Sequence, residues 1–318
     1  MGNENSVPQK DLKGTEHHGL MLATISFSHF SEAARWALQI SGTEFEEKGY
    51  LPGYHDLPLW IGAGADDKRK DSGEKNPTAE LPILLDKDDK VVGTDAVAIV
   101  ERFLGPVSEN QIPNLKKILV DDIGGSVQSI IYSHLLQTEE GDDTYLRICK
   151  EGDRHGWFQK LTYCYIPGPR HLIKGGLKDE HVKDDKNVDA MRKKLEAAVA
   201  KVQPFLKALP FTKSDGSATP AGVMLASLMY PIVSPPEHDL AYAGKELHGD
   251  GLKDLPSDMK KEVEKWRATP IGQFTLDFYK KHRMPAHLAA NPPEEEEEEE
   301  KKKGGQEKVA ASNGAGKK

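Results

Sequence analysis

The order of strand and helix signals in the first third of the chain constrains its fold more than any other feature. Residues 20–27 (LMLATISF) form an apolar run typical of a buried strand, and residues 31–38 (SEAARWAL) follow as a predicted helix. Glu32 suits the N-terminal dipole of that helix, and residues 44–50 are a second predicted strand. The segment therefore predicts a β-α-β unit.

A hairpin signal and a capped helix follow a predicted loop over residues 50–79. Residues 81–92 contain a short apolar run, a charged turn and two valines, which is the pattern of two strands joined by a tight turn. Thr94 and Asp95 precede an apolar helix that ends before Gly105-Pro106. The expected result is a small mixed sheet with helices beside it.

Beyond Pro106 every periodic segment is helical. Apolar residues recur there at steps of three or four, which places them on one face of a helix. A small sheet joined by a short linker to several helices is a restricted architecture. Helices are predicted at residues 113–137, 188–209, 219–231 (ended by Pro231), 259–266 and 270–282.

Charge and composition exclude several classes of function. The 318 residues carry a formal net charge of −8, and an acidic protein lacks the basic face that a general nucleic-acid binder needs. No apolar run has the length of a membrane-spanning helix. With only Cys149 and Cys164, a disulfide framework is excluded and a reducing, cytoplasmic compartment is expected. No His/Cys cluster indicates a metal site.

Both ends of the chain are predicted to be disordered. Residues 1–18 are polar, and the C-terminal stretch contains seven consecutive glutamates, Glu294–Glu300, a composition that cannot bury an apolar core. The start, Met1–Ser6 (MGNENS), fits the N-myristoylation pattern at Gly2. One acyl chain would give weak, reversible membrane association, and an unmodified leader is the alternative.

Three stretches of the chain resemble the glutathione transferase superfamily. Residues 28–38 (SHFSEAARWAL) resemble its first strand-to-helix turn, where a Ser or Cys stands seven residues before an Arg. Residues 80–84 (ELPIL) and 95–99 (DAVAI) resemble the second half of its thioredoxin-like domain, in which an apolar residue precedes a cis-proline. Residues 221–236 and 267–283 look like helices of bacterial-type members.

The resemblance implies both a fold and a function. The expected fold is an α/β thioredoxin-like domain followed by an all-α helical domain. A serine-type member would conjugate the thiolate of glutathione, its co-substrate, to a small hydrophobic electrophile, and would form homodimers. The alternative is a non-catalytic binding or scaffold protein on the same fold. The expected domains are a disordered leader (1–18), a thioredoxin-like glutathione-binding domain (19–105), a helical domain (106–290) and a disordered tail (291–318).

Ser28 is the first candidate for the catalytic residue, and Ser31 is the second. Lowering a thiol pKa of about 8.5 by about two units requires roughly 3 kcal/mol of preferential thiolate stabilisation. A hydroxyl hydrogen bond to a charged group contributes about 1.5–3 kcal/mol, and a helix N-terminus about 0.3–1 kcal/mol. Ser28, where a strand meets a helix, would supply both. The alternative is that the two serines only cap the helix.

The second half of the thioredoxin-like domain is expected to bind glutathione. By resemblance, Pro82 is the cis-proline that turns the Leu81 backbone outward, where it pairs with the cysteinyl part of glutathione like an added strand. Asp95 would attract the ligand's ammonium group or cap the following helix. Ala96 stands where the family has a serine for the γ-glutamyl carboxylate. Binding is therefore expected to be about ten- to hundredfold weaker unless Thr94 compensates.

Two expectations concern the helical half. Gly222 stands where relatives carry an aspartate that completes a capping box, so about 0.5–2 kcal/mol of helix support is expected to be missing. Four aromatic residues are expected to wall the acceptor pocket, with a place in the core as the alternative for each. They are Tyr54, Trp60, Tyr132 and Trp157.

Overall fold

The strand and helix order predicted for the first part of the chain is present in the computed structural model. β1 (Leu20–Ile25) leads into α1 (His29–Ile40), and β2 (Phe45–Tyr50) follows. The structure describes residues 19–25, 27–52, 81–88, 90–151, 159, 163, 165, 167–238 and 255–283. Most of the predicted loop over 50–79 and both of the predicted disordered ends lie outside these residues.

One mixed sheet contains the four described strands. β3 (Ile83–Leu85) and β4 (Val91–Gly93) form the predicted hairpin, and α3 (Ala96–Leu104) begins after it. The strand order is β2-β1-β3-β4, with β1 parallel to β2, and with β3 antiparallel to both β1 and β4. A β-α-β unit followed by a β-β-α unit in one sheet is the thioredoxin-like arrangement, so the predicted fold is confirmed.

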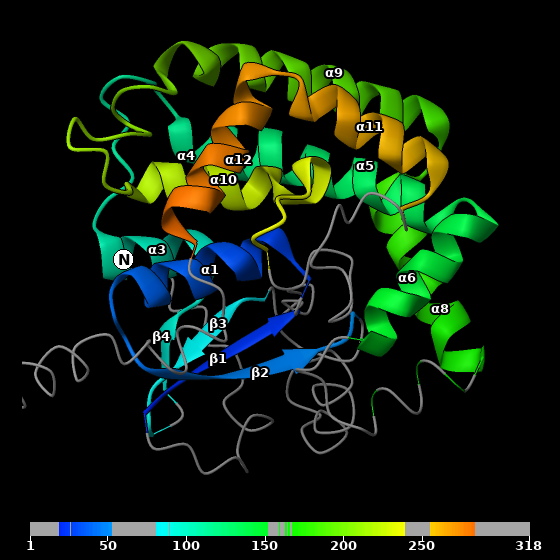
Figure 1. Cartoon of the computed structure of the whole chain (residues 1–318). Helices are drawn as coiled ribbons and strands as arrows, with labels where there is room; N and C mark the ends of the chain where they lie inside the picture. The colour runs from blue at the N-terminus through cyan, green and yellow to red at the C-terminus, as the bar shows by residue number, and fades with distance from the viewer. Residues whose placement is uncertain are drawn as a thin grey trace, which may run out of the picture. The chain divides into compact units, whose positions relative to one another are not determined.

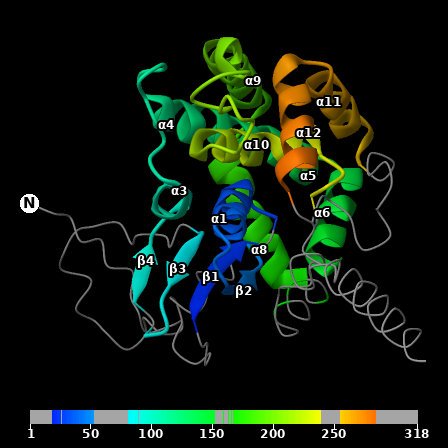
Figure 2. The same cartoon turned by 60° about the vertical axis from the view of Figure 1, so that its left-hand side comes forward.

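Helices pack above this sheet. Figures 1 and 2 both show α1 and α3 between the sheet and the upper group of helices, which includes α9, α10 and α12, whereas α6 and α8 lie to one side. α10 (Pro220–Val233) packs on α1 and α12, and all its residues from Ala221 to Val233 are buried. The helical half of the predicted fold is thus confirmed. The other helices are α4 (Leu115–Lys117), continued by the π-helical stretch Ile118–Gly124 into α5 (Gly125–Leu136), α6 (Glu139–Glu151), α8 (Pro167–Leu177), the π-helical stretch Lys178–Val182, α9 (Asp185–Val202), the 3-10 turn Gln203–Phe205, α11 (Ser257–Arg267) and α12 (Pro270–His282).

Two helix ends differ from the prediction, and a proline is involved in each. The helix predicted over 188–209 stops at Val202 because Pro204 has no amide hydrogen for the α-helical ladder, and a 3-10 turn follows. The helix predicted to end at Pro231 instead continues to Val233 and ends at Ser234, whose φ of 52° lies in the left-handed region. Because α10 is buried along its length, its packing outweighs the hydrogen bond that Pro231 cannot make.

Thr-x-x-Gly sequences start three of the described helices. In α10, Thr219 Oγ1 accepts a hydrogen bond from the Gly222 amide at 2.9 Å and donates one to the Phe211 carbonyl at 2.9 Å. A Cβ atom at Gly222 would lie 2.4 Å from that carbonyl oxygen and 2.8 Å from the Phe278 ring. The same pairing of a threonine cap with a crowded glycine starts α12 at Thr269 and Gly272, and α6 at Thr138 and Gly141.

The half of a capping box that a side chain at position 222 would make is absent, and its expected cost to α10 stays a prediction, because the Thr219 bond is the other half. Thr219 supplies the cap, and the absent side chain lets the Phe211 carbonyl approach the first turn closely enough to accept the threonine hydrogen bond. An aspartate at position 222 would have to displace backbone atoms or an aromatic ring. The start of α10 is packed too closely for a side chain at position 222. The glycine there is therefore explained by packing and is not evidence against catalysis.

In the described part of the chain, no helix is both long enough and apolar enough to cross a membrane. Within the same residues, no group of three or more His, Cys, Asp or Glu side chains is arranged to hold a metal ion.

Candidate functional site

Three chain segments of the predicted site meet at one edge of the sheet. Ala23 of β1 lies opposite Ile83 of antiparallel β3, and Gly93 of β4 lies opposite Leu84. The C-terminal ends of β1 and β4 and the N-terminal end of β3 therefore share one edge, which we call the β1–β3–β4 edge. The residues that follow β1 and β4 and precede β3 include the predicted site residues Ser28, Leu81, Pro82, Thr94, Asp95 and Ala96.

Ser28 is the N-cap of α1 and is half-buried at this edge. Its Oγ accepts a hydrogen bond from the Ser31 amide at 3.5 Å, a long bond that uses a lone pair and does not use the hydroxyl hydrogen. Ser31 is fully buried, and its Oγ accepts from the Ile25 amide at 3.2 Å. Ser31 thus holds the turn between β1 and α1, and Ser28 is the serine that can face a ligand.

Both neighbours of Ser28 are tied to the helical half. Tyr230 of α10 donates a hydrogen bond to the Phe27 carbonyl, and His29 Nε2 donates to the Gly124 carbonyl at 3.1 Å. Burial raises the pKa of Tyr230 and lowers the pKa of His29 to about 4. Both groups are therefore neutral donors near neutral pH, and the turn that carries Ser28 is held from both sides.

A buried group of charged side chains fixes the rest of α1. Glu32 contacts Arg35 one turn along the helix and accepts from Arg283 Nε at 2.8 Å. Arg35 donates to both carboxylate oxygens of Glu47 in β2, at 2.6 and 2.8 Å. Although burial would raise it, the pKa of Glu32 is held well below its usual range by Arg283 and His238. The sheet, α1 and the end of α12 are therefore joined by ion pairs that are shielded from water.

The Leu81–Pro82 segment enters the sheet at the same edge. The peptide bond between the two residues is cis, as the resemblance predicts. Leu81 is half-buried, and the pairing of β3 with β1 starts two residues later, at Ile83. The Leu81 main chain therefore lies at the rim of the sheet, where an extended ligand could pair with it.

α3 begins at this edge with an aspartate cap. Asp95 Oδ1 accepts from the Ala98 amide at 2.8 Å, and the Thr94 hydroxyl donates to Asp95 Oδ2 at 3.3 Å. Thr94 and Asp95 are exposed, whereas Ala96 is buried in the core. Asp95 therefore caps α3, which is the alternative role predicted for it. The Thr94 hydrogen is directed to Asp95, so this structure gives no sign that Thr94 replaces the missing serine hydroxyl.

Only Tyr132 of the four predicted pocket aromatics lies within the described residues. Its side chain is 8% exposed and its ring stacks on His181 with centroids 5.1 Å apart, so it is a core residue. Sequence reasoning missed two other tyrosines near the turn. The Tyr145 ring packs edge-on against Phe27 at 6.1 Å, and Tyr163 donates a hydrogen bond to the Tyr145 hydroxyl at 2.8 Å. Tyr54, Trp60, Trp157 and the lipidation candidate Gly2 lie outside the described residues.

Comparisons with known proteins find similar chains among solved structures. No protein-family model and no curated protein matches the sequence. The β-etherase LigF from Sphingobium sp. strain SYK-6 is 16% identical, with a TM-score of 0.42 over 82% of this chain and 99% of its own. The glutathione S-transferase Xi from Phanerochaete chrysosporium is 12% identical, with a TM-score of 0.38 over 88% of this chain and 89% of its own.

A third similar structure is the glutathione S-transferase from Methylobacillus flagellatus KT with glutathione bound. It is 10% identical, with a TM-score of 0.36 over 80% of this chain and 98% of its own. All three TM-scores are below 0.5. The thioredoxin-like assignment therefore stands on the strand order and register of this chain itself.

Proposed function

We propose that this chain binds glutathione at the β1–β3–β4 edge and conjugates its sulfur to a small hydrophobic electrophile. The observation that carries the proposal is the placement of Ser28, a half-buried hydroxyl at the N-terminus of α1 whose hydrogen the cap bond does not use. A thiolate at this position would accept that hydrogen and lie at the positive end of the α1 dipole. These contributions, about 1.5–3 and 0.3–1 kcal/mol, would lower a thiol pKa by about 1–3 units.

The rest of the tripeptide would be held by main-chain groups. The cysteinyl residue would pair with the Leu81 N–H and C=O at the rim of the sheet. The γ-glutamyl carboxylate would accept hydrogen bonds from the first amides of α3, where the helix dipole favours an anion. The exposed Asp95 carboxylate would attract the ammonium group of the same residue.

In the proposed reaction the thiol loses its proton to solvent, and Ser28 donates a hydrogen bond to the resulting thiolate. The sulfur electron pair forms a bond to the electrophilic carbon, and the bond between that carbon and its leaving group breaks with its electron pair. Ser28 stays protonated throughout and forms no covalent bond. Phe27, which is half-buried beside Ser28, would supply apolar surface for the electrophile.

A non-catalytic glutathione-binding or scaffold protein is the second candidate, and Ala96 is the observation that favours it. The methyl group of Ala96 lies in the core and offers no hydroxyl to the carboxylate of glutathione. Weak binding without turnover is the behaviour that this candidate predicts. In its lipid-anchored form Gly2 would be myristoylated, which the intact mass of the protein purified from its own cells would show or exclude.

Retention on immobilised glutathione, followed by a conjugation assay with 1-chloro-2,4-dinitrobenzene, tests the proposal. We expect specific elution by free glutathione and measurable turnover in the wild type. Ser28→Ala should keep most of the retention and lower turnover about ten- to hundredfold at pH 6.5, because the thiol pKa rises by about 1–2 units. Ser41→Ala is the matched control, because Ser41 caps the far end of α1 and is exposed. Retention without turnover would favour the scaffold, and neither retention nor turnover would refute glutathione binding.

A further inference from the structure

The π-helical stretch Ile118–Gly124 leads from α4 into α5. Its hydrogen bonds span five residues instead of four, as in the bond that the Gly125 amide donates to the Val120 carbonyl. One extra residue in a turn rotates everything after it by about 100° relative to an uninterrupted α-helix. The stretch therefore decides which side of its last residue, Gly124, meets the rest of the protein. Turns of this kind are rare and frequently lie at functional sites.

Gly124 is buried against the start of α1 and against α10. Its carbonyl accepts the 3.1 Å hydrogen bond from His29 Nε2. A Cβ atom at this position would lie 2.8 Å from the Phe30 ring and 3.1 Å from the Leu228 side chain, so a larger residue would have to displace one of them. His29 and Phe30 directly follow Ser28 in α1. The π-helical stretch thus touches the two residues next to the proposed thiolate partner.

Contacts with the helical half anchor the π-helical stretch. Lys194 of α9 donates a hydrogen bond to the Asp121 carbonyl at 2.8 Å and pairs with Asp122 Oδ1 at 3.1 Å. Ile123, the residue before Gly124, has no exposed surface. Gly124 is therefore held in place by contacts other than the one it makes with α1.

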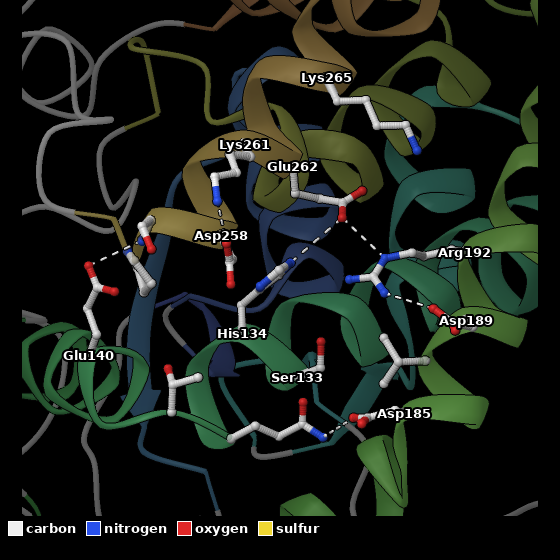
Figure 3. Close-up of a pocket in the computed structure, with 15 residues that line it drawn as sticks. Ser133, His134, Glu140, Asp185, Asp189, Arg192, Asp258, Lys261, Glu262 and Lys265 are labelled. Carbon is white, nitrogen blue, oxygen red and sulfur yellow. Dashed lines mark hydrogen bonds and ion pairs between the residues drawn. The ribbon is translucent and has the colours of Figure 1, made fainter.

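The far end of α5 is also held by neighbouring helices. His134 of α5 and Arg192 of α9 both face Glu262 of α11, with nitrogen–oxygen distances of 3.8 and 3.2 Å (Figure 3). The turn that carries Ser28 is the weaker side of the contact, because Ser28 is half-buried and its cap bond is long, at 3.5 Å. A side chain added at Gly124 would therefore move the start of α1 more readily than α5.

We propose that Gly124 is a positioning residue for Ser28, because its carbonyl holds His29 and so sets where the serine hydroxyl lies at the β1–β3–β4 edge. The proposal rests on the function proposed above, in which that hydroxyl donates to the glutathione thiolate. A displaced turn would lengthen this hydrogen bond and weaken it. The Leu81 main chain and the first amides of α3 would stay in place, since neither contacts Gly124. The expected defect is weaker stabilisation of the thiolate, with retention on glutathione kept.

Gly124→Ala is the direct test. At saturating glutathione it should raise the apparent pKa in the pH profile of kcat/KM for 1-chloro-2,4-dinitrobenzene by about one unit, and lower the rate at pH 6.5 about five- to tenfold. Gly125→Ala is the matched control and should leave that pKa unchanged, since a Cβ atom there would meet nothing closer than the Val120 carbonyl oxygen at 3.9 Å. Gly124→Ala/Phe30→Leu makes room for the added methyl group and should restore the pKa of Phe30→Leu alone.

Substitutions of His29 test the same contact from its other side. His29→Gln keeps a side-chain donor for the Gly124 carbonyl, whereas His29→Leu removes it. His29→Leu should raise the apparent pKa about as far as Gly124→Ala does, and His29→Gln should raise it less. These variants add no atoms beside Gly124, so they apply even where Gly124→Ala disturbs folding.

The thiol of Ser28→Cys separates this proposal from the proposed function. Its pKa is measured without glutathione, from the pH dependence of its alkylation by iodoacetamide, with mass spectrometry of the peptide to exclude the two native cysteines. Adding Gly124→Ala should raise that pKa by about half a unit to one unit, whether or not the wild type conjugates glutathione. A Gly124→Ala protein with a lower Tm but with both pKa values unchanged would show that Gly124 only supports the fold. Equal shifts in Gly125→Ala would also overturn the proposal.

Discussion

A Gly222→Asp substitution separates two accounts of how α10 begins. If the helix lacked an acidic capping residue, aspartate would complete a capping box and add about 0.5–2 kcal/mol to the free energy of unfolding. The structure predicts the opposite sign. A Cβ atom at this position would stand 2.4 Å from the Phe211 carbonyl oxygen and 2.8 Å from the Phe278 ring.

The size of the loss follows from these contacts. Forcing extra atoms into a packed site costs about 1–3 kcal/mol. A shift of the Phe211 carbonyl would also weaken its hydrogen bond from Thr219, worth about 0.5–1.5 kcal/mol. The total is roughly 2–4 kcal/mol, which for a chain of 318 residues lowers Tm by about 3–6 °C.

Thermal unfolding followed by far-UV circular dichroism measures this effect. Gly222→Ala should also destabilise, because the Cβ atom alone makes the clash. Gly176→Ala in α8 is the matched control, since a Cβ atom there meets nothing within 4 Å. In a helix interior this control should gain about 0.5–1 kcal/mol. A Tm that rises in Gly222→Asp would refute the packing account and restore the capping deficit.

Two further predictions concern the turn that carries Ser28. Tyr230→Phe keeps the stack on His238 but leaves the Phe27 carbonyl without its donor, so the free energy of unfolding should fall by about 1–3 kcal/mol. The substitution should lower the conjugation rate of the otherwise wild-type protein and add no further loss in a Ser28→Ala background. Additive losses would mean that Tyr230 does not act through Ser28. Since the pKa of His29 falls from about 6.5 to about 4 on folding, the unfolded chain binds more protons between these pH values. Denaturant titrations should therefore show up to about 3 kcal/mol of stability lost from pH 6.5 to pH 4, with a smaller loss in His29→Phe, and equal slopes in the two proteins would contradict this cause.

Local patterns predicted much of the fold. Three strands of the sheet lie within the apolar run at residues 20–27 and the hairpin at 81–92. They could be predicted because a buried strand shows as a short apolar run and a hairpin as two such runs around a polar turn. α6 and α8 were not predicted. α6 begins with the strongly polar run Glu139–Asp143, and α8 contains two prolines and three glycines, so neither has a clear apolar period.

Tertiary contacts set the features that sequence reasoning missed. Nothing near Tyr230 in the sequence shows that its hydroxyl meets the Phe27 carbonyl, 203 residues away. The role of Gly222 likewise depends on the Phe211 carbonyl, which a loop brings to the helix start. One signal was available for the second feature, because Thr-x-x-Gly recurs at Thr138, Thr219 and Thr269. A threonine cap followed by glycine at the third helical position indicates that a backbone carbonyl from another part of the chain approaches the first turn of the helix closely.

The pKa of the bound glutathione thiol tests the central claim most directly. It is read from the pH dependence of kcat/KM for 1-chloro-2,4-dinitrobenzene at saturating glutathione, where the glutathione complex is the form that meets the electrophile. With Ser28 donating at the N-terminus of α1, the wild type should show an apparent pKa near 6–7, below the free value of about 8.5. Ser28→Ala should raise it by about 1–2 units, because a hydrogen bond of about 1.5–3 kcal/mol is lost. The same pH profile in both proteins would show that Ser28 does not stabilise the thiolate.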